Sequence, residues 1–314
     1  MTSIEVNEFG LIGRFYVSAK ADQKKPGVIL LSGSDGGIPG ANAIPLHFIE
    51  TLVDKGFAVL ALAYFGHEGL PPRLEGIGLE YFEQAANWLQ TRPEVNKDAL
   101  AIIGQSRGAE LALLLGTMFD HFRAIVAFAP SNRVTGCFPY SNRPAWQYQG
   151  HVIRPFLGGL TGTSEHLTEL DELTNAVKQG LIAKHENSES DPFIIRDLFT
   201  ARNQMEGSAR CEIPVEKIAC PVLLFSGGQD AIWPSQHYCE AIINRLKQYG
   251  ANRSYQHINF KDAGHGLIGG FDGPIYHPVG QFWCRLGGTP AGNRAANENL
   301  VRETLSFLRK KLTP

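Results

Sequence analysis

The chain has 314 residues, of which 43% are hydrophobic and 19% are charged, a composition typical of a folded protein and unlike that of a disordered one. The 29 Lys and Arg residues nearly balance the 31 Asp and Glu residues, and the net charge of −2 argues against binding to nucleic acid. The sequence shows neither a secretory signal nor an apolar run of roughly 20 residues, the length of a membrane span. We therefore expect a cytoplasmic protein without nucleic-acid or membrane partners. The composition leaves the oligomeric state open.

The cysteines and histidines form no metal-binding pattern. The five cysteines are widely scattered without a C-x-x-C pair, which indicates free thiols and argues against a disulfide framework or a zinc site. They are Cys137, Cys211, Cys220, Cys239 and Cys284. The ten histidines contain no H-x-x-x-H or H-x-H pair. We therefore expect no metal, and no organic cofactor is required.

Short apolar runs alternate with amphipathic stretches along the chain. The stretch "EVNEFGLIGRFYV" (5–17) suggests a pair of strands ahead of the core. Core strands are expected at 27–33, 57–65, 99–104, 124–130, 221–228 and 254–260. Helices are expected near 42–55, 75–91, 106–118, 234–249 and 293–312. Near-continuous apolar strands that alternate with helices predict an α/β fold, with a mostly parallel central sheet and helices on both of its faces.

Residues 131–215 interrupt this alternation. They contain no strong buried strand and are rich in polar residues, Gly and Pro. A gap of this length in a compact domain is usually functional. We interpret it as a lid or cap, partly helical around 164–181, inserted between two core segments at 1–130 and 216–314. A surface insertion without a function is the alternative.

A serine at the start of an expected helix is the first candidate for chemistry. Residues 102–111 read "IIGQSRGAEL", with Ser106 between two glycines. A sharp turn from strand to helix lifts a serine hydroxyl to the carboxyl edge of a sheet, and the helix N-terminus directs free N–H groups at developing negative charge. Chance alone gives about 0.2 such motifs in a chain of this composition. Ser106 as a nucleophile therefore needs support from partners elsewhere in the chain.

Such partners follow later strands. A serine nucleophile needs a general base, and the base needs an acid that orients it, in the chain order Ser, Asp or Glu, His. Asp230 follows the strand expected at 221–228, and His265 follows the next strand. We therefore interpret Ser106, Asp230 and His265 as a catalytic triad. Asp262 is the alternative acid, but its position three residues before His265 is more typical of a surface loop.

The chemistry also needs N–H groups that stabilise an oxyanion. One belongs to the residue after the serine, Arg107, and the other comes from the loop after an early strand. The Gly-rich stretch "LLSGSDGGIPG" (30–40) is such a loop, and we assign its donor to Ser34, with Asp35 as the nearest alternative. The side chain of Arg107 either pairs with Glu110 at i, i+3, which we favour, or binds an anionic substrate.

Three further residues near these motifs are assigned to substrate binding. Gly33 and Asp35 belong to the Gly-rich loop, and His67 follows the strand expected at 57–65. His67 precedes the serine in the chain, which is the wrong order for the general base. The Gly-rich loop is a weak candidate for phosphate binding, because it lacks the lysine of a P-loop and the G-x-G-x-x-G of a dinucleotide site.

Several separated blocks of the sequence resemble one known family. They include "GFAVLALAYFGHEGLP", "GQSRGAELAL", "IPVEKIACPVLLFSGGQDAIWPS", "AGHGLI" and "LGGTPAGNRAANENLVRETLSFL". The chain resembles the C-terminal catalytic domain shared by type I acyl-CoA thioesterases and bile acid-CoA:amino acid N-acyltransferases, which is dienelactone-hydrolase-like. The resemblance implies an α/β-hydrolase fold, and it carries the family's triad to Ser106, Asp230 and His265.

The chain also departs from the family pattern. Animal members have a β-sandwich domain ahead of the hydrolase domain, whereas the first core strand is expected here at 27–33. The nucleophile is Ser, as in the thioesterase members, where the acyltransferase members have Cys, and this difference favours water as the acceptor of the acyl group. Residues 131–215 match the family poorly until "IPVEK", so the expected lid is specific to this protein.

We therefore expect a serine hydrolase that acts through an acyl-enzyme on a small-molecule acyl thioester, either acyl-CoA or an acyl carrier, or on an ester. An acyltransferase that passes the acyl group to an amine or alcohol is one alternative. A carboxylesterase or amidase of secondary metabolism is another. A non-catalytic binding protein on a hydrolase fold is a remote alternative, because the triad and the Gly-rich loop are both intact.

Overall fold

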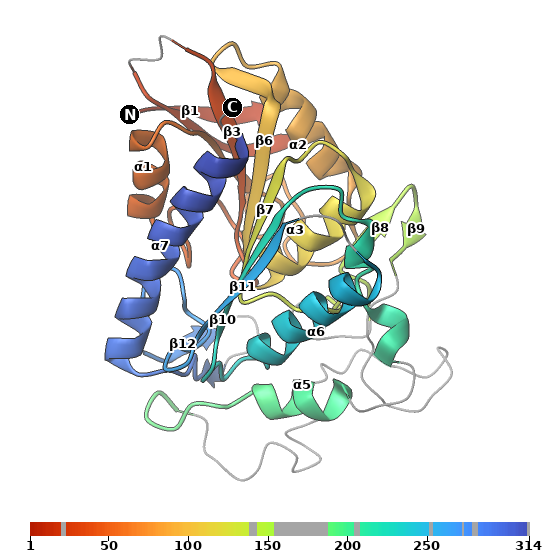
Figure 1. Ribbon diagram of the computed structural model, residues 1–314, viewed down its shortest axis with the longest axis vertical. Coiled ribbons are helices and arrows are strands. Elements are labelled where there is room, and N and C mark those ends of the chain that lie inside the picture. The colour runs from red at the N-terminus through yellow and green to blue at the C-terminus, as the bar shows by residue number, and fades with distance from the viewer. Residues whose placement is uncertain are drawn as a thin grey trace.

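A computed structural model describes most of the chain (Figure 1). The described residues are 1–19, 23–137, 143–153, 188–203, 208–250, 254–271, 273–277 and 282–312. They include every residue to which the sequence assigns a chemical role, whereas the helix expected around 164–181 lies outside them.

An eight-stranded sheet forms the centre of the fold, in the order β1-β2-β4-β3-β6-β7-β10-β11. At one edge, β1 (Thr2–Glu8) and β2 (Leu11–Val17) form an antiparallel hairpin, and β2 also pairs antiparallel with β4. The other pairs are parallel, between β3 (Lys25–Leu31), β4 (Ala58–Ala63), β6 (Val95–Gln105), β7 (Ala124–Phe128), β10 (Val222–Gly227) and β11 (Tyr255–Phe260). Both the expected strand pair and the mostly parallel sheet are confirmed.

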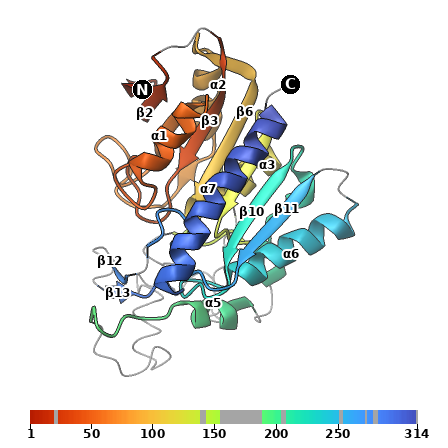
Figure 2. The same ribbon diagram turned by 60° about the vertical axis from the view of Figure 1, so that its left-hand side comes forward.

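Helices cover both faces of this sheet because the central strands are apolar on both sides. Side chains 28 to 31 of β3 are all fully buried, and successive side chains point to opposite faces. Ile29 and Leu31 pack in one apolar cluster with α2 (Glu80–Gln90), α3 (Arg107–Met118) and α6 (Ser235–Gln248). Val28 and Leu30 pack in a second cluster with α1 (Leu46–Asp54) and α7 (Pro290–Leu312), which cross in front of the sheet in Figure 2.

Smaller elements lie outside the central sheet. The described parts of the 131–215 insertion contain two short strands, a helix and a 3-10 helix: β8 (Trp146–Tyr148), β9 (His151–Val152), α5 (Arg196–Asn203) and η1 (Ser208–Cys211). A second 3-10 helix, η2 (Val215–Lys217), starts at the last residue of the insertion. β8 pairs with β9 and with β5 (Ile77–Gly78), and a hairpin joins β12 (Ile275–His277) to β13 (Phe282–Cys284). The N–H groups of Ile195 and Arg196 both donate to the carbonyl of Ala231, just past β10. These two hydrogen bonds attach the insertion to the carboxyl end of β10.

An ion pair fastens the end of the insertion to α6. Arg245 donates from Nε to Glu216 Oε2 at 2.5 Å and from Nη2 to Glu216 Oε1 at 2.8 Å, and its Nη1 donates to Glu212 at 3.1 Å. The hydrogen bonds from Arg245 lower the pKa of the Glu216 carboxyl below its ordinary value of 4.5. A two-pronged contact of this kind holds η2 more firmly than a single surface ion pair would.

Replacing Glu216 by Gln should lower the free energy of unfolding at pH 7 by about 1 kcal/mol. Because the folded-state pKa of Glu216 lies below the unfolded value, the stabilisation is fully present above pH 4.5 and is lost as the pH falls through the folded-state pKa. Urea unfolding of both proteins from pH 7 to pH 3 should show a difference that shrinks in this range. Glu298→Gln, which alters an exposed carboxylate on α7, is the control. A difference independent of pH would contradict the account.

Candidate active site

Ser106 lies in a strained turn between β6 and α3. Its φ of 55° and ψ of −116° fall in a region that side chains other than glycine rarely adopt. Glycines on both sides make the turn possible: a Cβ on Gly104 would lie 2.0 Å from the Gly108 carbonyl oxygen, and one on Gly108 would lie 2.3 Å from the Ser32 carbonyl oxygen. The N–H of Ser106 donates to the carbonyl of Phe128 at 2.8 Å. The turn therefore fixes the serine at the carboxyl edge of the sheet.

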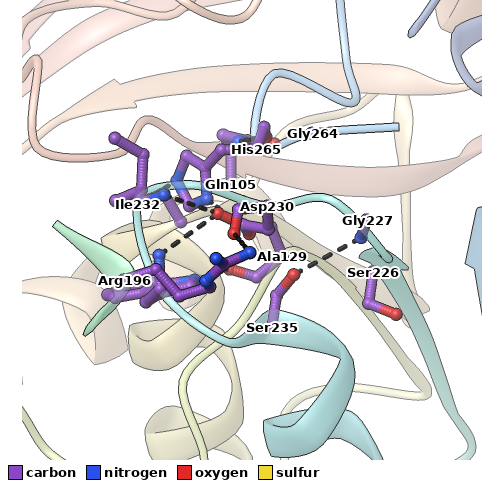
Figure 3. A network of polar contacts seen from close by, with 12 residues as sticks. Gln105, Ala129, Arg196, Ser226, Gly227, Asp230, Ile232, Ser235, Gly264 and His265 are labelled. Atoms are coloured by element: carbon purple, nitrogen blue, oxygen red, sulfur yellow. Dashed lines mark hydrogen bonds and ion pairs between the residues drawn. The ribbon is translucent and has the colours of Figure 1, made fainter. Parts of the chain in front are cut away.

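The structure brings His265 and Asp230 to this serine. His265 Nε2 lies 2.8 Å from Ser106 Oγ, and its Nδ1 lies 2.8 Å from Asp230 Oδ2. Asp230 Oδ1 accepts the N–H groups of Ile232 at 2.9 Å and Trp233 at 3.2 Å, so both carboxylate oxygens are held. Asp230 is 2% exposed and His265 is 6% exposed. Figure 3 shows the imidazole beside the Asp230 carboxylate. These contacts form one hydrogen-bonded chain from hydroxyl to carboxylate.

The alternative acid, Asp262, does not contact the imidazole. Its side chain is exposed, and its Oδ1 accepts a hydrogen bond from Gln229 at 3.4 Å. The choice of Asp230 in preference to Asp262 therefore agrees with the geometry.

A loop ahead of α7 supports the loops of both Asp230 and His265, and sequence reasoning missed it. Backbone bridges join Gly287 to Asp230 and Gly288 to Ala263, and the N–H of His265 donates to the carbonyl of Leu286 at 2.8 Å. The two glycines have φ of 84° and 77°, which suits them to this close approach. The Gly-Gly pair in "RLGGTP" is the signal that could have revealed this loop.

The Gly-rich loop runs directly beside Ser106. A Cβ on Gly33 would lie 3.1 Å from Ser106 Cβ. Within the described residues, neither the N–H of Ser34 nor that of Arg107 donates a hydrogen bond to another residue. Neither N–H is therefore engaged by another described residue, and the two belong to the segments that meet at Ser106.

The residues expected to bind substrate lie at or near an open cleft. The cleft has a volume of about 430 Å³ and is lined by Asp35 and His67. Arg14 of β2 also lines it, which no sequence motif indicated, because β2 reaches this place only through its pairing with β4. Gly33 lies beside Ser106, next to this cleft.

The side chain of Arg107 turns into the protein and pairs with Glu110. Arg107 Nη2 lies 3.4 Å from Glu110 Oε1 and donates to the Thr135 carbonyl at 3.0 Å. Glu110 is completely buried, and it accepts the Thr135 N–H at 3.1 Å, the Thr135 hydroxyl at 2.6 Å and the Trp146 indole N–H at 2.9 Å. The favoured i, i+3 pairing is confirmed. Thr135 and Trp146 belong to the insertion, so this buried network ties the insertion to α3, the helix that follows Ser106.

Replacing Glu110 by Ala should leave the buried guanidinium of Arg107 without its counter-ion. We expect the free energy of unfolding to fall by about 3–5 kcal/mol, as when one partner of a buried ion pair is removed. Thr135→Val is the matched control, because it removes one hydroxyl hydrogen bond and keeps the ion pair, with an expected loss of about 1–2 kcal/mol. Urea unfolding measures both. Equal losses of unfolding free energy in the two variants would contradict this account, because they would mean that the Glu110 charge contributes no more than one hydroxyl hydrogen bond.

Metal, membrane and thiol features can be stated for the described part of the chain. There, no group of three or more His, Cys, Asp or Glu side chains could hold a metal ion. No helix in that part is long and apolar enough to cross a membrane. The five cysteines are buried, and burial raises the pKa values of the Cys239 and Cys284 thiols.

The sheet order, the serine in its strand-to-helix turn and the acid and base after later strands define an α/β-hydrolase fold. The α/β hydrolase GrgF from Penicillium sp. sh18 shares it, with a TM-score of 0.56 and 16% identity, over 100% of this chain and 99% of that one. A puromycin-hydrolyzing peptidase of Mycobacterium tuberculosis gives a TM-score of 0.57 at 15% identity, over 99% of this chain and 39% of that one.

Within this class, the chain belongs to the family described as BAAT / Acyl-CoA thioester hydrolase C terminal, which matches residues 77–314. The resemblance noted in the sequence is thereby confirmed. Mouse acyl-coenzyme A thioesterase 2, mitochondrial, is 28% identical over 295 residues, 91% of this chain and 55% of the relative. Mouse acyl-coenzyme A amino acid N-acyltransferase 2 is 29% identical over 296 residues, 91% of this chain and 60% of the relative. The chain thus spans little more than half the length of these relatives. One of them is named mitochondrial, so a cytoplasmic location stays a prediction.

Proposed function

We propose that this protein is a serine hydrolase that forms an acyl-enzyme on Ser106 and releases the acyl group to water. The hydrogen-bonded chain from Ser106 Oγ through His265 to Asp230, with both contacts at 2.8 Å, carries the proposal. A nucleophile, a base and an orienting carboxylate in contact are the parts that acyl transfer requires. A protein that only binds ligands has no need of this arrangement, which argues against the non-catalytic alternative.

Acylation starts when Ser106 Oγ attacks the carbonyl carbon of the substrate and its proton passes to His265 Nε2. Asp230 holds Nδ1 of the imidazole and stabilises the imidazolium that forms. The bond to the leaving thiol or alcohol then breaks, and His265 gives the proton to the leaving sulfur or oxygen. In deacylation a water molecule gives a proton to His265 and attacks the acyl carbon. Ser106 takes that proton back as the free acid leaves.

The N–H groups of Ser34 and Arg107 are proposed to stabilise the oxyanion in both steps. Two observations support this role: neither N–H donates to another residue in the described part of the chain, and a Cβ on Gly33 would lie 3.1 Å from Ser106 Cβ, which places the Gly-rich loop beside the serine. A donor of this kind typically contributes a factor of about 10²–10³ to the rate, because it is oriented before charge develops.

We infer an acyl thioester as the substrate class, with an oxygen ester as the alternative. The curated relatives are named acyl-coenzyme A thioesterases and acyl-coenzyme A amino acid N-acyltransferases. Their identities to this chain, 28% and 29%, do not separate hydrolysis from transfer. Transfer of the acyl group to an amine or alcohol is therefore the second candidate function, and the serine nucleophile is the feature that favours water.

We further propose that the 131–215 insertion acts as a lid on a core formed by 1–130 and 216–314. Arg196 Nη1 donates to the Asp230 carbonyl at 3.4 Å, a contact drawn in Figure 3. Phe199 packs edge-on against Trp233 at 5.7 Å, and Trp233 packs edge-on against the His265 ring at 5.4 Å. A segment that contacts the Asp230 loop, and that packs on Trp233 where Trp233 meets the His265 ring, is suited to shape the acyl pocket and to keep water out.

A fluorophosphonate probe should label the native protein at Ser106. The variant Ser106→Ala should lose the label and at least 10³-fold of any esterase or thioesterase rate, because the nucleophile is gone. Asp230→Asn should lower the rate by about 10³–10⁴, since the imidazole loses its orienting carboxylate. Peptide mass spectrometry identifies the labelled residue. Ser306→Ala, on the exposed side of α7, is the control and should keep both label and rate. Labelling at another serine would contradict the proposal.

The products of acyl-CoA turnover should separate hydrolysis from transfer. We expect the free acid as the main product, and we expect the rate of CoA release to be unchanged when primary amines or amino acids are added in millimolar amounts. Chromatography of the products with mass detection measures both, with Ser106→Ala as the blank. An amide as the main product would favour the acyltransferase alternative.

A further inference from the structure

Asp35 is a charged residue beside the nucleophile that the proposed mechanism does not use. A methyl group on the Gly33 Cα would lie 3.1 Å from Ser106 Cβ and 3.3 Å from Asp35 Oδ1, so little more than one small residue separates the carboxylate from the nucleophile. The transition state gathers negative charge on the substrate oxygen, and like charges repel. A carboxylate at this position would therefore slow the reaction unless a positive group accompanies it.

A backbone hydrogen bond holds the Asp35 side chain in place, and no cationic side chain in the described part of the chain pairs with it. Its Oδ2 accepts the N–H of Ala43 at 2.8 Å, which holds the carboxylate against the Gly-rich loop. Within the described residues, no Lys, Arg or His side chain forms an ion pair with it, although Arg14 and His67 line the same cleft. Backbone N–H groups of Gly33 and Asp35 also hydrogen-bond the carboxyl group, so the loop supplies it with N–H donors but with no positive charge.

The surroundings of Asp35 disfavour its ionised form, so a cation beside the carboxylate would stabilise it more than in water. The side chain is exposed where the cleft opens, but protein atoms surround the carboxyl group on its other sides, and this desolvation raises its pKa above the ordinary 3.8. Backbone N–H groups of the loop, at Ala43, Asp35 and Gly33, and the nearby His265 act in the opposite direction. A positively charged ligand beside the carboxylate would likewise lower the pKa of Asp35 and favour its ionised form.

We propose that Asp35 forms a subsite for a cationic group of the substrate, an ammonium or a similar donor held next to the scissile bond. This inference rests on Ser106 being the nucleophile of the proposed function. The ammonium would donate a charge-assisted hydrogen bond to the carboxylate and neutralise it, so that the oxyanion forms beside an ion pair. A substrate with an anionic group at this position would be rejected for the same electrostatic reason.

Two phosphonothioate probes of matched size test the subsite. The S-(2-aminoethyl) and S-propyl esters of one methylphosphonothioate differ only at the end of the leaving group, where the first carries an ammonium at pH 7.5. Ser106 Oγ attacks phosphorus, the P–S bond breaks, and His265 passes the serine proton to the leaving thiolate. Inactivation therefore needs only the nucleophile and its base. Second-order inactivation constants are measured for both probes, and peptide mass spectrometry verifies the adduct on Ser106.

The native protein should prefer the ammonium probe, and Asp35→Asn should reduce that preference by about tenfold, the effect of one charge-assisted hydrogen bond. The intrinsic reactivities of the probes cancel in this comparison of preferences. Asn keeps an acceptor for the Ala43 N–H, and a thermal melt verifies that the variant is folded. Glu68→Gln, which removes an exposed carboxylate beside His67 that does not line the cleft, should keep the native preference.

An equal preference in the native protein and in Asp35→Asn would overturn the inference, and so would an equal loss in Glu68→Gln. Failure of both probes to react at Ser106 would overturn the proposed function and this inference with it. Reaction of the propyl probe at Ser106 without any preference for the ammonium would overturn the inference alone.

Discussion

The left-handed backbone of Ser106 is the constraint on which the rest of the site depends. An L-residue with φ of 55° costs of order 1–3 kcal/mol, and such strain persists only where the surrounding structure enforces it. Here Gly104 and Gly108 let β6, α3 and the Ser32 carbonyl approach more closely than any Cβ would allow. Because the turn is enforced, Ser106 Oγ lies at the carboxyl edge of the sheet, where the loops after β3, β10 and β11 converge.

Those loops are held in turn by residues far along the chain. The glycines at 287 and 288 bridge to the loops that carry Asp230 and His265, and a Cβ on Gly287 would lie 1.9 Å from the Gln229 carbonyl oxygen. The Asn293 side chain at the start of α7 donates to the Gly287 carbonyl and accepts the Gly264 N–H. The C-terminal helix therefore stabilises the geometry between Asp230 and His265 as well as covering the sheet.

Much of this arrangement could be predicted from local sequence signals. Apolar strands, the Gly-x-Ser-x-Gly turn and the chain order of acid and base all follow from short patterns, and they indicated the three residues that the structure joins by hydrogen bonds. The contacts of Glu110 with Thr135 and Trp146 could not be predicted, because 25 and 36 residues separate these partners and no periodicity records which loop returns to α3. The Asp35 carboxylate was expected to meet substrate, but only the packing around it showed that no cationic side chain among the described residues pairs with it.

The central claim is that Ser106 carries the acyl group between donor and acceptor. The most direct test is a rapid acid quench of the native protein during turnover of an acyl-CoA thioester, followed by peptide mass spectrometry. The account predicts that the peptide containing Ser106 gains the mass of the acyl group in place of one hydrogen, and that Ser106→Ala shows neither the adduct nor turnover. Turnover without an adduct on Ser106, or with an adduct on one of the cysteines, would contradict it.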